Sequence, residues 1–234
     1  MGRHFEVRAA AMAASAKAKS AIYMRASKEI YAAAKSGEPD PNSNLALRSA
    51  IEKYRKSCPK DVIERAIEKA KGGDAVAYIP GRYEFMGPAG SYIIVDTLTD
   101  NVNRALVSVR TIVTRKGGKM ASVSYNFEQL GVLNFSGVAE ADVEEALIMG
   151  DVDVREVTES DGSIQALVAP SDLEKAKTCL KDLNVTDYDR AEIVMWPNDW
   201  IEVDDDALAQ LKGMLEQLDE CEDVQSVYTN VDNL

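Results

Sequence analysis

The apolar positions repeat with a helical period over the first third of the chain. A first helix is expected over residues 9–35, a second from about Asn44, and a third from Pro59 to the glycines at 72–73. In the first helix, the residues on the apolar face are Ile22, Tyr23, Ala26, Ile30 and Ala34. Three amphipathic helices with short connections predict a small helical bundle.

After residue 73 the pattern changes to the alternation typical of strands. Strands are expected over 82–86 and 91–99, followed by a helix over 102–116 that Asp100 caps. A further strand is expected over 121–127, because every second residue of that range is apolar.

Residues 132–196 predict a second mixed unit. The expected order is strand 132–135, helix 140–149, strands 152–157 and 164–168, helix 172–183 and strand 192–196. This βαββαβ order is typical of a ferredoxin-like sandwich. A helix over 205–218 and a strand over 224–229 would return to the first sheet. The predicted fold class is therefore α+β and multidomain: a helical domain over 1–76, an α/β domain over 77–130 plus 198–234, and an inserted ferredoxin-like domain over 131–197.

The charge of the chain is distributed unevenly. The net charge is −12, but residues 1–73 hold 15 Lys/Arg and 8 Asp/Glu, a net of +7, and the remainder has a net of −19. A basic first third can neutralise phosphates, whereas the acidic remainder would repel a polyanion. A solvated helix face with surplus lysines would also explain the basic part.

Hydropathy and cysteine use indicate the compartment. No run of about 18 apolar residues exists, so no membrane partner is expected. The three cysteines are odd in number and far apart, as in a reduced cytoplasmic protein. The Ala-rich start resembles an organelle transit peptide, but its helical pattern continues to residue 35, which favours a place in the mature protein.

Catalytic chemistry is not supported by the residue types available. His4 is the sole imidazole, and nothing nearby supplies a nucleophile and an orienting acid. The acidic clusters at 204–206 and 219–223 lack the spacing of a Ca²⁺ loop, and the first of them suits a helix start. We expect no enzyme activity, no cofactor and no metal.

A candidate anion site lies where the strand 91–99 gives way to a helix. Asn101, Asn103 and Arg104 lie at that helix N-terminus, where backbone N–H groups and a guanidinium can hold a phosphate. The alternative is a capped helix with solvated arginines. The basic residues of the acidic remainder concentrate in and just after this helix, at Arg110, Arg115, Lys116 and Lys119.

Several stretches in the same order resemble the YebC family, especially its YeeN-like branch. They are Glu29–Pro41 with the preceding Ile22-Tyr23, Ile63–Gly73, Tyr83-Glu84 with Gly87-Pro88, Thr99–Arg104, Lys116–Gly118, Ser122–Tyr125 and Asp223–Asn230. The family includes the mitochondrial translational activator of cytochrome c oxidase. The resemblance implies a helical N-terminal domain and two α/β domains, with the third inserted in the second.

The resemblance also implies a nucleic-acid-binding regulator. Two alternatives remain: a ribosome-associated translation factor that binds rRNA or tRNA and relieves stalling at prolines, and a DNA-binding transcriptional regulator. We favour the first, with a monomer favoured and the oligomeric state left open. The expected nucleic-acid-binding residues at the start of the helix 102–116 are Asn101, Asn103 and Arg104. Those in the first third are Arg3, His4 and Arg8, which precede the first helix, and Lys17, Lys19, Arg25 and Lys28, which lie on it.

Overall fold

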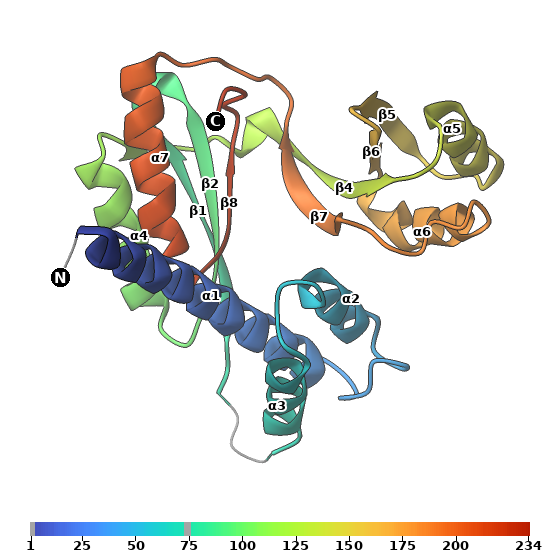
Figure 1. Ribbon diagram of the computed structural model, residues 1–234, viewed down its shortest axis with the longest axis horizontal. Helices are drawn as coiled ribbons and strands as arrows, with labels where there is room; N and C mark the ends of the chain where they lie inside the picture. Colours follow the sequence, from blue (N-terminus) through green and yellow to red (C-terminus); the bar gives the residue numbers. More distant parts are fainter. Residues whose placement is uncertain (1–2, 73–75) are drawn as a thin grey trace. The chain divides into compact units, whose positions relative to one another are not determined.

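The chain folds into two compact units, each described by itself (Figure 1). The computed structural model describes the backbone of residues 3–72 and 76–234, and the side chains of residues 18–72 and 76–234. The first unit is Met1–Ser124 with Asp199–Leu234, and the second is Tyr125–Asn198. The expected α+β class, with leading helices followed by mixed α/β parts, is confirmed.

The helical part of the first unit consists of α1 (Arg3–Lys35), α2 (Leu45–Tyr54) and α3 (Lys60–Lys71). The helix α1 starts earlier than expected because no glycine or proline interrupts residues 3–9. Asn44 joins α1 to α2: its Oδ1 accepts the N–H of Leu47 at 3.0 Å, and its Nδ2 donates to the Ala33 carbonyl at 2.9 Å. The buried core of the bundle includes Ala26, Ile30, Tyr31, Leu47, Ala50, Ile63 and Ala66.

A four-stranded antiparallel sheet completes the first unit. Its order is β3-β1-β2-β8, formed by β3 (Lys119–Met120), β1 (Ile79–Met86), β2 (Tyr92–Thr99) and β8 (Val224–Thr229). Two helices, α4 (Val102–Arg115) and α7 (Asp205–Asp219), lie side by side on this sheet (Figure 1). Their contact buries Val109, Val113, Leu211 and Met214 against Phe85, Ile93 and Val95.

The second unit has the βαββαβ order that the sequence predicts. Its sheet order is β5-β6-β4-β7 and all its pairings are antiparallel, which is the strand arrangement of a ferredoxin-like sandwich. Its elements are β4 (Phe127–Ser136), α5 (Glu140–Met149), β5 (Val154–Ser160), β6 (Ser163–Val168), α6 (Leu173–Lys181) and β7 (Arg190–Pro197). The core packs both helices on the sheet around Leu133, Phe135, Leu147, Ile164 and Leu180.

The strand expected over 121–127 is wrong. Only Lys119–Met120 pairs with β1, and a 3₁₀ turn at Ser124–Asn126 precedes β4. The Glu84 carboxylate accepts the backbone N–H groups of Val123 at 2.7 Å and Ser124 at 2.8 Å. These two donors are therefore directed to a side chain instead of a neighbouring strand, and the alternation of apolar residues does not produce a strand.

Among the described residues, no helix combines the length and apolarity that crossing a bilayer requires.

Candidate nucleic-acid interface

The expected nucleic-acid-binding residues of α1 fall into two groups. The backbone of Arg3, His4, Arg8 and Lys17 lies in α1, but their side chains lie outside those that the structure describes. Lys19 is exposed to solvent on the same helix. Arg25 and Lys28, about two turns further along the helix, are half-buried and contact residues near the opposite end of the chain.

The partners of Arg25 and Lys28 are the acidic segment, which we define as Asp219–Asp223, and the adjoining Val224. Arg25 contacts the Asp219 carboxylate through Nη2 at 3.1 Å, and its Nε donates to the Val224 carbonyl at 3.2 Å. Lys28 donates to the Glu222 carbonyl at 2.7 Å and lies 3.4 Å from the Asp223 carboxylate. These contacts join α1 to the turn between α7 and β8.

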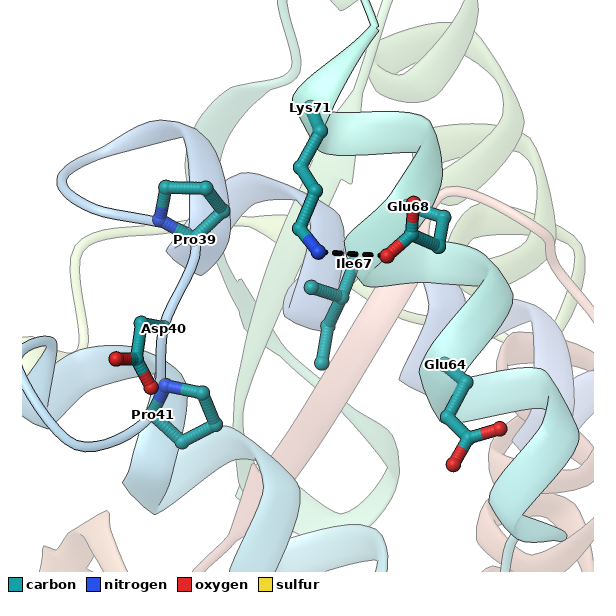
Figure 2. Close-up of a pocket in the computed structure, with 7 residues that line it drawn as sticks. All are labelled: Pro39, Asp40, Pro41, Glu64, Ile67, Glu68 and Lys71. Carbon is teal, nitrogen blue, oxygen red and sulfur yellow. Dashed lines mark hydrogen bonds and ion pairs between the residues drawn. The ribbon is translucent and has the colours of Figure 1, made fainter.

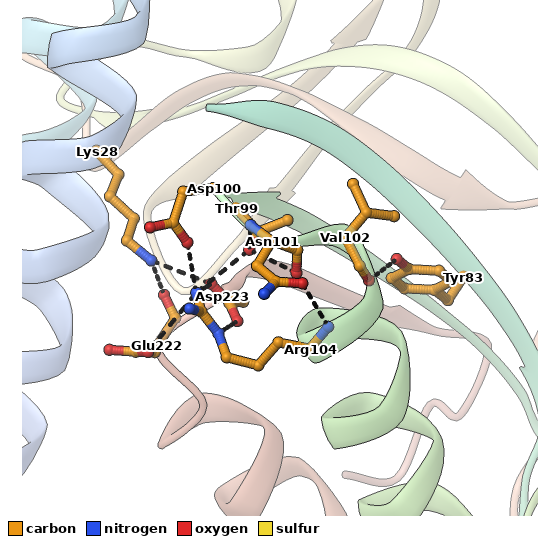
Figure 3. A network of polar contacts seen from close by, with 9 residues as sticks. All are labelled: Lys28, Tyr83, Thr99, Asp100, Asn101, Val102, Arg104, Glu222 and Asp223. Carbon is orange, nitrogen blue, oxygen red and sulfur yellow. Dashed lines mark hydrogen bonds and ion pairs between the residues drawn. The ribbon is translucent and has the colours of Figure 1, made fainter. Parts of the chain in front are cut away.

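Arg104 forms the centre of the same network (Figure 3). Its guanidinium makes a bidentate contact with Asp223, with Nε–Oδ2 at 2.9 Å and Nη2–Oδ1 at 2.7 Å, and also contacts Asp100 Oδ1 at 2.7 Å. The Asp223 side chain is only 2% exposed, whereas that of Arg104 is 41% exposed. A buried carboxylate therefore receives cations from two helices that are far apart in the sequence.

The pKa values in this network move in the directions that favour both charged forms. Burial alone would raise the pKa of Asp223, but hydrogen bonds from Arg104 and Thr99 and the charge of Lys28 outweigh it, and the pKa is lowered. The hydrogen bonds that Arg104 donates to Asp223 and Asp100 raise the pKa of its guanidinium. Both groups stay ionised near neutral pH.

The helix start beside Arg104 is capped by the chain itself. Asn101, not Asp100 as expected, is the N-cap, and its Oδ1 accepts the Arg104 backbone N–H at 3.0 Å. Thr99 Oγ1 accepts the Asn101 N–H at 3.0 Å. Asn103 lies exposed in the first turn of α4. The Asp100 carboxylate instead binds the Arg104 guanidinium through Oδ1.

Three residues that were expected to contact phosphate therefore bind carboxylates or carbonyl groups of the same chain. For Arg25, Lys28 and Arg104, nucleic-acid contact stays a prediction, and one that requires a phosphate to displace the acidic segment. The sequence singled out Thr99–Arg104 and Asp223–Asn230 separately as distinctive stretches. It did not indicate that the two stretches meet.

The acidic clusters have structural roles where the structure shows them. Asp204 is the N-cap of α7, and its Oδ1 accepts the Ala207 N–H at 2.8 Å, in agreement with the interpretation as a helix start. Within residues 18–72 and 76–234, no group of three or more His, Cys, Asp or Glu side chains is arranged to hold a metal ion.

An open pocket of about 500 Å³ lies between the α1–α2 connection and α3 (Figure 2). Two of its acidic side chains already have partners: Asp40 Oδ1 accepts the Asn42 N–H at 3.0 Å, and Glu68 binds Lys71 at 2.6 Å. The pocket is lined by Pro39, Asp40, Pro41, Glu64, Ile67, Glu68 and Lys71. The Asp40 contact lies within the α1–α2 connection, and the Glu68–Lys71 pair lies within α3.

Fold and site together define a class: an α+β protein in which a helical bundle is joined by ion pairs to a sheet domain that contains a ferredoxin-like insertion in its sequence. The N-terminal domain model of the TACO1/YebC proteins matches residues 3–73, and the model of their second and third domains matches residues 78–231. The chain belongs to the TACO1/YebC family.

Relatives resemble the whole chain. It is 43% identical over 238 residues to the probable transcriptional regulatory protein YeeN of Escherichia coli K12, and the match covers 100% of both chains. It is 46% identical to the probable transcriptional regulatory protein Mfl546 of Mesoplasma florum, over 98% of this chain and 99% of the relative. Among solved structures, the conserved hypothetical protein Aq1575 from Aquifex aeolicus is 29% identical with a TM-score of 0.78, covering 91% of this chain and 90% of that one.

Proposed function

We propose that this protein is a noncatalytic regulatory factor that binds nucleic acid, and that its target is rRNA or tRNA on the ribosome. The observation that carries the proposal is the separation of charge, +7 over residues 1–73 against −19 over the remainder. Phosphate contacts dominate nucleic-acid affinity, so the basic third would supply the binding energy while the acidic remainder orients it.

RNA suits this surface better than a DNA major groove. Structured RNA is recognised largely by shape and by contacts to phosphates and 2′-hydroxyls, for which dispersed lysines and arginines suffice. Base edges in the DNA major groove are read mostly by Arg, Lys, Asn and Gln side chains, commonly from one helix, and residues 18–35 of α1 contain no Asn or Gln. The described face of α1 carries mostly Ala, Ser and Lys, and its Arg25 contacts the acidic segment.

The proposed action is relief of stalling at consecutive prolines. Orienting two reactants can accelerate a reaction without any catalytic side chain, so a factor that fixes the tRNA ends would help a slow peptide transfer. The proposed compartment is the cytoplasm.

A second candidate is supported by the names of the relatives, since YeeN and Mfl546 are both called probable transcriptional regulatory proteins. It would make the protein a DNA-binding regulator of transcription.

Sedimentation of cell lysate at moderate salt separates the two candidates. A ribosomal factor is expected in the ribosome fractions, and nuclease treatment that spares ribosomes should leave it there. Recovery only with chromatin would favour the DNA-binding candidate. Ribosome footprints from cells lacking the gene should then show deeper pauses at proline runs, whereas unchanged pauses would contradict the proposed action.

A further inference from the structure

One segment of the acidic remainder carries no acidic residue. Residues 101–127 contain five Lys or Arg and no Asp or Glu, although residues 74–234 as a whole have a net charge of −19. The segment comprises α4, the glycine turn after it, the edge strand β3 and the following 3₁₀ turn. A local positive potential is therefore expected on this part of the sheet domain.

The cations of this segment differ in their partners. Arg104 binds Asp223 and Asp100, as described above. Arg110, Arg115 and Lys119 are exposed, and the described residues provide none of the three with an ion pair or a hydrogen bond through its side chain. We define the α4–β3 surface by these three residues and the half-buried Lys116.

The turn between α4 and β3 is held tightly. Gly118 is buried, and its N–H donates to the Val113 carbonyl at 3.0 Å. A Cβ on Gly118 would lie 2.5 Å from Val113 Cγ1, and Gly117 has a positive φ of 84°. The turn therefore fixes the backbone between Lys116 and Lys119, so these two cations start from a rigid base.

The helix α7 leaves room for Lys116. The Lys116 ammonium lies against Gly213, where a Cβ would come within 3.1 Å of Nζ. The stretch of α7 from 207 to 215 contains no acidic residue, so its sequence provides no carboxylate for this ammonium. A glycine in a helix interior costs about 1 kcal/mol relative to alanine, yet this one stands where the cation approaches α7.

Helix electrostatics explains only part of this arrangement. Cations in the last turn of a helix interact favourably with its dipole, which accounts for Arg115 and Lys116. Arg110 lies more than one turn before the end of α4, and Lys119 lies beyond it on β3. Neither position gains from the dipole.

We propose that the α4–β3 surface binds the phosphodiester backbone of RNA. Exposed cations without carboxylate partners can neutralise phosphates without first breaking an ion pair of the protein. The inference rests on the proposed function and places an RNA contact on the sheet domain in addition to α1.

The test compares two charge-matched triple variants of the full chain. In the first, Arg110→Gln, Arg115→Gln and Lys119→Gln remove the exposed cations of the α4–β3 surface. In the second, Arg155→Gln, Lys175→Gln and Lys181→Gln remove three exposed cations from the second unit. Binding of a fluorescein-labelled RNA hairpin, and of a DNA duplex of the same sequence, is measured by anisotropy over a series of KCl concentrations.

The first variant is expected to bind the hairpin more weakly and to lower the slope of log K against log salt by about 2 to 3. The control variant should keep the wild-type slope. A double variant of the wild-type chain, Arg110→Lys with Arg115→Lys, should bind the hairpin as the wild type does, because phosphate contact needs only the charge. Thermal unfolding followed by circular dichroism confirms that each variant is folded.

The measurements distinguish failure of the α4–β3 proposal from failure of the proposed function. Equal slopes for the two triple variants, with RNA binding intact, would overturn the α4–β3 surface and leave the proposed function standing. A loss confined to the DNA duplex would overturn the RNA assignment. Absence of wild-type binding to either probe would overturn both proposals.

Discussion

Two basic regions of this protein carry similar side chains in opposite electrostatic settings. On α1, Arg25 and Lys28 contact the acidic segment Asp219–Asp223, and on the sheet domain Arg104 binds the buried carboxylate of Asp223. On the α4–β3 surface, the exposed Arg110, Arg115 and Lys119 have no such partner among the described residues. Charge counted along a sequence therefore does not tell which cations are available to a ligand.

The two regions are expected to have different roles, one in stability and the other in nucleic-acid binding. Cations bound to carboxylates hold α1 and α4 to the start of β8, and their removal should cost stability. Cations without partners should contribute little to stability and more to nucleic-acid binding. Substitutions in each region can separate these effects.

The largest effect is expected when the shared carboxylate is removed. Asp223→Ala deletes the acceptor of Arg104 and Lys28, and charge-assisted hydrogen bonds of this kind contribute about 1.5–3 kcal/mol each, so a loss of about 3 kcal/mol in the free energy of unfolding is expected. Urea denaturation followed by circular dichroism measures it. The control Asp232→Ala removes an exposed carboxylate, and equal losses in both variants would show that the network does not stabilise the fold.

The turn after α4 offers the next test. Gly118→Ala places a methyl group against Val113 and the Met86 carbonyl in a buried site, and overpacking of this kind costs about 1–3 kcal/mol. Gly213→Ala is the matched control, because its Cβ meets only the flexible end of Lys116, which can move into solvent. Thermal unfolding should show a lower Tm for Gly118→Ala alone; a similar decrease in both would mean that Lys116 cannot move away.

A smaller difference is expected between two double variants of equal charge. Arg25→Gln with Lys28→Gln removes contacts to the acidic segment and should lower the free energy of unfolding by about 1 kcal/mol, since exposed partners weaken such pairs. Arg110→Gln with Arg115→Gln removes no such contact among the residues that the structure describes, and should change the free energy of unfolding by less than about 0.5 kcal/mol. Urea titrations of both variants measure the two losses in the free energy of unfolding. A larger loss for Arg110→Gln with Arg115→Gln would contradict the proposed difference between the two regions.

The smallest predicted effect is a dependence on pH. The folded-state pKa of Asp223 lies below its ordinary value, so its contribution to stability is complete above the ordinary carboxyl range and is lost as the pH falls through the folded-state pKa. The free energy of unfolding should therefore decrease with acidification below that range, and less steeply in Asp223→Asn. Parallel pH profiles of the wild type and Asp223→Asn would show that ionisation of Asp223 does not contribute to the pH dependence of stability.

Local signals in the sequence predicted most of the fold. Hydrophobic periodicity located α5 and β8 at their observed limits, and the glycines at 117–118 and at 150 end helices as expected. The strand expected over 121–127 failed because Glu84, distant in sequence, accepts the backbone N–H groups of Val123 and Ser124. An alternating pattern contains no information about such a long-range acceptor.

The candidate site was predicted less well for a related reason. The sequence identified Arg104 and the Asp223 stretch separately, but their contact joins residues 119 positions apart. Local patterns can place both residues at the ends of elements, and only the strand pairing of β2 with β8 brings those ends together. The partners of Arg25 and Lys28 depend on the same pairing.

Mass spectrometry of protein–RNA crosslinks, formed by ultraviolet light on ribosomes carrying the wild-type protein, tests the central claim most directly. Crosslinked peptides are expected from the α4–β3 surface, at residues 110–119, and from the N-terminal half of α1. Crosslinks confined to the acidic residues 199–234 or to the second unit, with none in those two regions, would contradict this claim.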